Sequence, residues 1–150
     1  MVEQQINTEY TELKAKIETI EIALAQILAQ IKYRTKIIRL KDSKEIHYIY
    51  VCMIDSVQVY NHICTFLFND KTEFKYVNTL NNVRCLLSPY FEQINRNTIV
   101  NINEIDTICH QRHIIKLKSG VEYTCSEGKT SKIEHLLDVV NGIFRKNSPI

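Results

Sequence analysis

Asn95, Arg96 and Asn97 form a short polar cluster in the middle of a stretch, residues 91–105, whose alternating apolar and polar residues predict a strand. Apolar residues lie on both sides, with Ile94 just before the cluster and Ile99 soon after it. This pattern predicts a turn that the apolar side chains anchor to a core, with the three polar side chains displayed on it. Guanidinium and amide donors on a rigid loop suit phosphate oxygens and base edges, because little side-chain order is lost on binding. From spacing alone, a polar turn without a ligand is an equally good interpretation.

Arg96 is the residue of this cluster that we expect to matter most. An arginine on a loop can bind guanine in the major groove or enter a narrow minor groove. Its plainer interpretation is a surface salt bridge with Glu92 or Glu104.

Two other sets of polar side chains could belong to the same surface. Asn61 and His62 fall between two predicted strands, and an asparagine amide pairs well with adenine in the major groove. Lys129 and Lys132 lie near the start of the last predicted helix, where the helix N-terminus also favours phosphate. Each set has a plainer interpretation, a turn for the first and a solvated helix face for the second. The polar residues 110–113 indicate a solvated hairpin tip or a phosphate contact.

The sequence offers little support for catalysis or metal binding. None of its five histidines has an acidic partner at a spacing that implies a triad or a metal centre. The odd number of scattered cysteines, without a Cys-x-x-Cys pair, argues against a zinc site and a disulfide framework. We therefore expect no enzyme activity, cofactor or metal, and interpret the cysteines as reduced core thiols. They are Cys52, Cys64, Cys85, Cys109 and Cys125.

The order of residues around the Asn-Arg-Asn cluster resembles the signature of the LytTR family of bacterial DNA-binding domains. That signature runs Phe-x-Arg-Ile-His-Arg-Ser, then two or three apolar residues, Asn, and soon an Ile. The matching residues are Phe91, Ile94, Arg96, Ile99, Val100, Asn101 and Ile105. Gln93, Asn95 and Asn97 stand where Arg, His and Ser are usual, which keeps hydrogen-bonding capacity but removes one positive charge. The resemblance extends over roughly residues 36 to 140.

The resemblance implies a mainly β (α+β) domain of small antiparallel sheets with short helices. It also implies sequence-specific binding of double-stranded DNA by loops, in a transcription regulator. Base contacts in the family come from three places, of which the first falls here near Asn61, His62 and Ile63 and the second at residues 95–97. The third falls near Glu127, Gly128 and Lys129, where the family usually has a basic residue. The acid and the glycine depart from the family, so Lys129 and Lys132 are the candidate substitutes.

The first part of the chain has the clearest periodicity. Apolar or aromatic residues recur at alternating steps of four and three: Ile6, Tyr10, Leu13, Ile17, Ile20, Leu24, Ile27 and Ile31. This spacing predicts a heptad seam, and thus a coiled-coil helix that joins copies of the chain, with a homodimer favoured. In a parallel dimer Glu9 would face Lys14, and Lys16 would face Glu21. An amphipathic helix packed on its own domain is the alternative, and isoleucine at both seam positions leaves the oligomer number open.

From Thr35 the period changes to two, which predicts strands. The predicted strands cover residues 36–40, 45–51, 57–60, 63–68, 72–77, 98–102, 105–109, 113–117 and 121–124. Two helices are predicted, at residues 79–87 and 130–144. Their expected inward-facing residues are Leu80, Val83, Leu86 and Leu87 in the first and Ile133, Leu136, Leu137, Val140 and Ile143 in the second. We thus predict a coiled coil at residues 1–34, a LytTR-like domain at 35–146 and a frayed tail at 147–150.

The charge distribution fits this division. Residues 1–33 hold three Lys and five Glu, a net charge of −2, and the remaining sixteen Lys or Arg and twelve Asp or Glu give +4. No apolar run approaches the roughly 18 residues of a membrane span, and no signal peptide is evident, so a cytoplasmic location is expected. Because the overall charge of +2 is small for a nucleic-acid binder, a β-rich module that oligomerises through its coil and binds protein rather than DNA is the alternative.

Overall fold

The structure is a computed structural model that describes residues 2–142. The chain divides into two compact units, with the boundary between Lys36 and Ile37. The predicted tail at residues 147–150, Ile143 and the predicted helix end at residue 144 lie outside the described residues.

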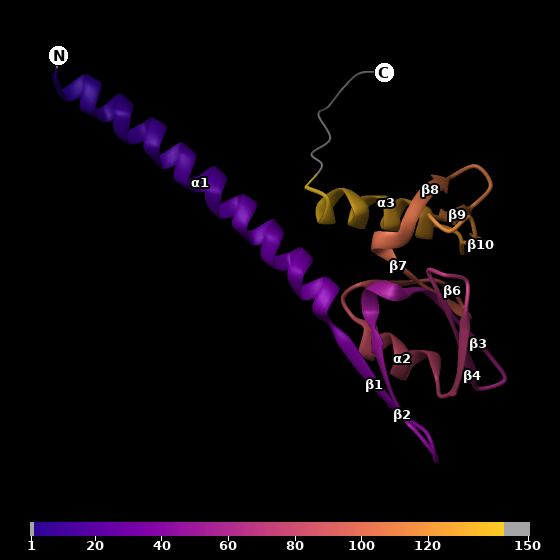
Figure 1. The fold of residues 1–150 in the computed structure, drawn as a ribbon. Helices are drawn as coiled ribbons and strands as arrows, with labels where there is room; N and C mark the ends of the chain where they lie inside the picture. Colours follow the sequence, from indigo (N-terminus) through magenta and orange to yellow (C-terminus); the bar gives the residue numbers. More distant parts are fainter. Residues whose placement is uncertain (1, 143–150) are drawn as a thin grey trace. The chain divides into compact units, whose positions relative to one another are not determined.

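The first unit is one helix, α1, which runs from Val2 to Thr35 (Figure 1). The segment contains neither glycine nor proline, so nothing in it interrupts the backbone hydrogen bonds. All eight predicted seam residues are exposed, with exposed fractions from 47% at Ile17 to 67% at Tyr10. The predicted long N-terminal helix is therefore confirmed, and its pairing with another copy stays a prediction.

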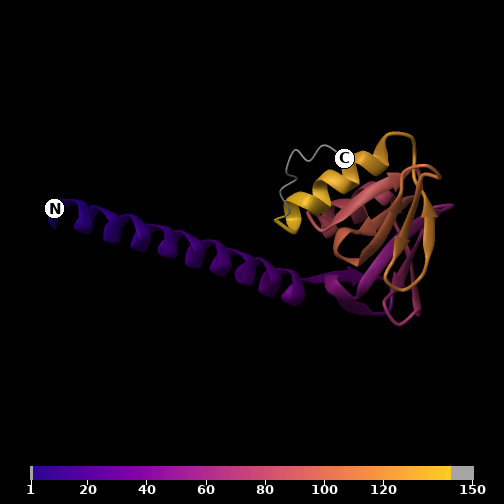
Figure 2. The same ribbon diagram turned by 90° about the horizontal axis from the view of Figure 1, so that it is seen from above.

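Among the described residues, the second unit is built on three antiparallel sheets (Figures 1 and 2). It also contains the helices α2 (Leu80–Leu87) and α3 (Lys129–Val140) and two short 3-10 turns (Val51–Met53 and Ile102–Glu104). The first sheet pairs β1 (Ile37–Lys41) with β2 (Ile46–Tyr50). The second has the order β5-β4-β3-β7-β6, from β3 (Ile54–Tyr60), β4 (Ile63–Phe68), β5 (Glu73–Val77), β6 (Phe91–Asn95) and β7 (Thr98–Asn101). The third has the order β10-β9-β8, from β8 (Ile105–Cys109), β9 (Ile114–Leu117) and β10 (Glu122–Thr124). The predicted fold of small antiparallel sheets with short helices is confirmed.

One apolar cluster joins α3 to the strands that lead into the polar turn. Helix α3 contacts β6 and β8. The buried members of this cluster are Ile94, Val100, Ile105, Ile115, Leu117, Cys125 and Ile133. Each fully buried Ile or Leu contributes roughly 1.5–3 kcal/mol of stability, so the cluster holds β6 and the start of α3 in one position.

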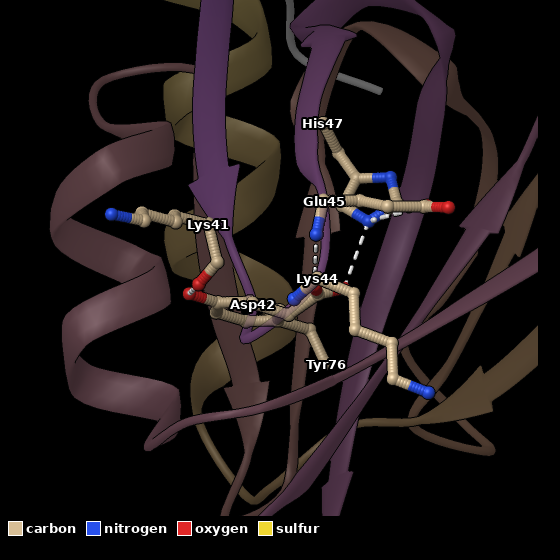
Figure 3. Close-up of polar contacts among 6 residues, drawn as sticks. All are labelled: Lys41, Asp42, Lys44, Glu45, His47 and Tyr76. Atoms are coloured by element: carbon tan, nitrogen blue, oxygen red, sulfur yellow. Dashed lines mark hydrogen bonds and ion pairs between the residues drawn. The ribbon is translucent and has the colours of Figure 1, made fainter.

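The β1–β2 hairpin is closed by a carboxylate and tied to the large sheet (Figure 3). Asp42 Oδ1 accepts backbone hydrogen bonds from Glu45 (2.6 Å) and Lys44 (2.8 Å), which lower the pKa of its carboxyl group. The hydroxyl of Tyr76, on β5, donates to the carbonyl of Lys41 (2.8 Å). The small sheet is thereby attached to the five-stranded sheet.

Three expectations about the helices and thiols are wrong in part. Leu86 and Val140 are exposed rather than inward-facing. Helix α3 ends at Val140 because Asn141 caps it through hydrogen bonds to the Leu137 carbonyl, and Gly142 follows with a positive φ. All five cysteines are free, but only Cys64 and Cys125 are buried, whereas Cys85 is exposed.

Strand β3 begins three residues earlier than predicted, and this start brings a carboxyl group into the interior. Ile54 pairs with Phe68 on β4, and Ser56 pairs with Val100 on β7, so these residues belong to the sheet. Between them, Asp55 is 1% exposed, and neither carboxylate oxygen has a hydrogen-bond partner in the described part of the chain. Burial raises the pKa of Asp55, and the nearby Ser119 hydroxyl offsets only part of this shift.

The raised pKa of Asp55 predicts a pH-dependent gain in stability for Asp55→Asn. Because the folded state holds the Asp55 proton more tightly than the unfolded chain, the free energy of unfolding falls as pH rises from the ordinary aspartate pKa to the raised value. The amide cannot ionise, so the variant should melt a few degrees above the wild type near pH 7. Below the ordinary aspartate pKa the two should melt together. Thermal unfolding followed by circular dichroism across pH 3–8 measures this difference.

Asp106→Asn, at an exposed position on β8, is the matched control and should show no such gain. An Asp55→Asn effect that is the same at every pH would contradict the role of ionisation.

Candidate nucleic-acid interface

The Asn95–Asn97 cluster forms the turn between β6 and β7, as the sequence predicts. Strand β6 ends at Asn95 and β7 begins at Thr98. The expected anchors Ile94 and Ile99 are buried, and so are the nearby Phe91 and Val100. The turn is thus fixed from both sides by side chains in the core.

Hydrogen bonds from Asn95 and Gln93 hold the turn in shape. Asn95 Oδ1 accepts from the backbone N–H of Asn97 (2.9 Å), and Asn95 Nδ2 donates to the carbonyl of Thr124 on β10 (2.8 Å). Gln93 Nε2 donates to the Asn95 carbonyl (3.0 Å). One N–H of the Asn95 amide is therefore already used within the domain, and the second remains for a ligand.

Arg96 is exposed at the tip of this turn. Within residues 2–142 its guanidinium has no hydrogen bond or ion pair. The expected alternative, a salt bridge with Glu92 or Glu104, does not form in this structure. The guanidinium is free to bind a ligand on a backbone that is already rigid.

Asn61 and His62 form the two-residue turn between β3 and β4. Their φ angles are +50° and +63°, the left-handed conformation that a tight hairpin of this kind requires at both central residues. Both side chains are exposed, and the His62 carbonyl accepts a hydrogen bond from the Asn78 N–H (3.0 Å). Next to this turn, the N–H of Val59 donates to the carbonyl of Asn97 (2.9 Å). The first and second predicted contact places are therefore neighbours.

The start of α3 lies on the other side of the Arg96 turn. The N–H of Ser126 donates to the Ile94 carbonyl on β6 (2.8 Å), and the N–H of Lys129 donates to the Ser126 carbonyl (3.1 Å). Gly128 precedes the helix with φ +79°, and none of the described side chains caps the helix start. The three places predicted from separate parts of the sequence are brought side by side, with Arg96 in the middle.

Comparison with known proteins identifies the family of this domain. The sequence matches the LytTr DNA-binding domain over residues 42–138, which is 97 of the 150 residues. The chain belongs to the LytTr family of DNA-binding domains. The structure is similar to the LytTr DNA-binding domain of a Bacillus cereus protein described as a methyl-accepting/DNA response regulator, with a TM-score of 0.53 and 16% identity over 72% of this chain and 98% of that one. No curated protein is significantly similar to the chain.

The LytTr family is one of DNA-binding domains, not of enzymes. No group of histidine, cysteine or acidic side chains suited to a metal ion occurs among the described residues. No helix in residues 2–142 is long and apolar enough to cross a membrane.

The LytTr signature asparagine has a structural role in this chain. Asn101 is completely buried, its Nδ2 donates to the Ile54 carbonyl (2.9 Å), and its Oδ1 accepts from the Asn103 N–H (3.0 Å). The bond to Ile54 joins the end of β7 to the start of β3, and the bond from Asn103 shapes the chain just after β7. An asparagine directly after a buried Ile-Val pair was the available sequence signal for such a role.

At the start of α3 an acidic side chain of β6 holds the two candidate lysines. Glu92 Oε1, on β6, lies 3.0 Å from Lys132 Nζ and 4.0 Å from Lys129 Nζ. The sequence suggests Glu92 only as an alternative partner of Arg96, because residues four apart are easier to pair than residues on distant elements. The positive charge of both lysines is thereby partly neutralised.

The turn between β8 and β9 is attached to α3 through a contact between a histidine and a glutamate side chain. His110 Nε2 lies 2.7 Å from Glu134 Oε2, which joins residues 110–113 to the middle of the helix. In the same turn, a hydrogen bond from the Arg112 side chain lowers the pKa of the Cys109 thiol. The prediction of a polar hairpin tip is confirmed, with His110 packed toward α3.

Proposed function

We propose that this chain is a sequence-specific, bacterial transcription regulator that binds repeated sites on double-stranded DNA as an oligomer joined by α1, in the cytoplasm. The observation that carries the DNA-binding part is the Arg96 guanidinium, unpaired within residues 2–142 and exposed on a turn that is hydrogen bonded on both sides. A donor already held in place loses little entropy on binding. The family to which the chain belongs consists of DNA-binding domains, which supports DNA as the ligand.

Within this proposal the polar residues have different roles. Arg96 reads a base, and Asn61, His62 and Asn97 provide the neighbouring donors and acceptors. Asn95 mainly positions the turn, since its amide already bonds to Thr124 and Asn97, and it offers one remaining N–H to the DNA. The lysines at positions 129 and 132 contact phosphates after their pairing with Glu92 is loosened. Phosphate contacts supply most of the affinity, and base contacts supply the discrimination.

The oligomer part of the proposal rests on the exposed apolar side of α1. The eight seam side chains are at least 47% exposed, so together they leave a large apolar stripe in water. A second copy of the helix covers such a stripe residue by residue, and each buried Ile or Leu adds roughly 1.5–3 kcal/mol. Opposite charges at Glu9 and Lys14, and at Lys16 and Glu21, favour the parallel arrangement. Two domains joined in this way address two half-sites of a repeated operator.

The alternative is a β-rich interaction module that oligomerises through α1 and does not bind DNA. One observation favours it, namely that Glu92 neutralises part of the positive charge at the α3 start. The two functions differ in salt dependence, because release of counterions on binding is characteristic of nucleic-acid contacts. Selection from a random duplex library at about physiological salt tests the proposal directly. Enrichment of a repeated motif supports the proposal. If no motif is enriched and bulk DNA shows no salt-sensitive binding, the result favours the alternative.

Arg96→Ala should weaken binding to the selected site by about 1–3 kcal/mol, because a bidentate contact to a base is lost. Binding to a scrambled duplex should change far less. Fluorescence anisotropy with both duplexes measures the two losses. Arg39→Ala, which removes an exposed arginine from β1, is the control. Equal weakening on both duplexes would instead make Arg96 a phosphate contact.

Glu92→Gln should raise affinity for DNA by up to about fivefold, since a surface ion pair of this type is worth at most about 1 kcal/mol and the lysines become available to phosphates. The slope of log affinity against log salt should become steeper by about 0.9 for each additional phosphate that a lysine neutralises. Glu45→Gln makes the same change of net charge at the β1–β2 turn and should leave the slope unchanged. Weaker binding by Glu92→Gln would mean that the ion pair holds the lysines in their binding position.

Replacing Ile17 and Leu24 with Lys should convert the oligomer into a folded monomer, because two charges would have to be buried in the seam. Light scattering measures the mass, and circular dichroism checks the fold. The control carries Ala15→Lys and Ile22→Lys, two exposed positions on the opposite side of the heptad pattern, and should keep the oligomeric mass. An unchanged mass for the seam variant would remove the coiled coil from the proposal.

A further inference from the structure

Three apolar side chains stand in one exposed row across the end of the five-stranded sheet. Tyr60 on β3 is directly opposite Ile63 on β4, and Ile63 is directly opposite Val77 on β5. Directly opposite residues of antiparallel strands point to the same face, so the three side chains are neighbours. Their exposed fractions are 78%, 42% and 75%. Exposed apolar residues are ordinary when single, but a contiguous row of them marks a contact surface.

The row borders the candidate DNA-binding surface on two sides. The Asn61–His62 turn connects Tyr60 to Ile63, so these polar side chains emerge between two members of the row. On the same sheet face, the next row consists of Gln58, Thr65 and Lys75. These three line a hollow together with Tyr60, with Glu73, whose carboxylate stands on the same face of β5 as Lys75, and with Asn97 from the Arg96 turn. The apolar row is thus continuous with both polar loops.

The chemistry of this surface matches one feature of duplex DNA. In the major groove the C5-methyl group of thymine is an apolar group beside hydrogen-bonding base edges, and the phosphates run along the rim. The surface offers the complementary groups in the same neighbourhood, with apolar side chains beside the Asn61–His62 turn and the Lys75 ammonium in the adjacent row. An apolar protein partner would have no use for an amide, an imidazole and an ammonium group at the edges of so small a row.

We propose that Tyr60, Ile63 and Val77 bind thymine C5-methyl groups in the major groove, next to the bases contacted by Asn61 and His62. The row then selects T·A pairs over C·G pairs at positions that no hydrogen bond reads. This inference rests on the proposed DNA-binding function and adds a determinant of its sequence preference.

The test compares thymine with uracil, which keeps the base-pairing edge and lacks only the C5-methyl group. The probes are the duplex selected from the random library and its copies in which single thymines are replaced by uracil. Each methyl group that the row removes from water should contribute about fourfold to affinity. We expect such a loss at one or more thymines in the half-site, measured by fluorescence anisotropy.

Variants connect the loss to these side chains. Ile63→Thr with Val77→Thr keeps β-branched residues, which favour strands, but replaces the ethyl group of Ile63 and one methyl group of Val77 with hydroxyls. Because Tyr60 remains in the double variant, its affinity ratio between the thymine and uracil duplexes should fall toward one, well below the wild-type ratio. Ile46→Thr on β2 is the matched control. The exposed fraction of Ile46 (43%) is close to that of Ile63 (42%), and Ile46 lies on another sheet. It should keep the wild-type ratio, and melting curves verify that all variants are folded.

The outcomes separate the inference from the function on which it rests. Specific binding by the wild type with equal affinity for thymine and uracil duplexes overturns the inference and leaves the proposed function intact. A double variant that keeps the wild-type thymine-to-uracil ratio also overturns it, and normal DNA binding by that variant would point to a protein occupant of the row. Absence of specific, salt-sensitive binding by the wild type overturns the proposed function itself.

Discussion

Two hydrogen bonds on either side of the Arg96 turn determine the arrangement of the whole candidate surface. The Asn97 carbonyl accepts from Val59, and the Asn95 amide donates to the Thr124 carbonyl. The first bond joins the turn to the β3–β4 hairpin, and the second joins it to the strand that leads into α3. Buried side chains behind the turn prevent it from shifting. Three segments that are distant in the sequence therefore present their side chains together, as a binding surface for an extended ligand requires.

The electrostatics of the domain explain how a weakly charged chain can bind DNA. A net charge of +2 gives little long-range attraction, so affinity must come from local contacts. Glu92 places a negative charge against the two lysines of α3 and leaves Arg96 as the cation of the turn that no described residue pairs. If Arg96 reads a base as proposed, such an arrangement would weaken binding to arbitrary DNA more than binding to the specific site. In the proposed oligomer joined by α1, affinity would be restored because the second domain would bind at a high effective concentration.

Much of the domain was predictable because its local patterns are consistent with its final structure. The heptad spacing predicted α1, alternation predicted most strands, and the apolar residues around Arg96 predicted an anchored turn. The errors occurred where local signals conflict with the sheet. Asp55 and Ser56 look unlike a buried strand, yet both lie inside β3, since the flanking strands pair with it on both sides. Asn141 caps α3 in the structure, whereas the apolar residues beyond it in the sequence suggested a longer helix.

The sequence by itself determined where most of the helices, strands and turns lie, and which polar residues fall at the turns. These properties depend on neighbours within one or two turns of chain, so periodicity and composition record them. Only the tertiary structure decided that Glu92 pairs with Lys132, that Asn97 meets Val59, and that Tyr60, Ile63 and Val77 share one row. Those contacts depend on strand register and on the docking of α3. Register changes the partner of every residue in a strand while leaving the alternation along that strand unchanged.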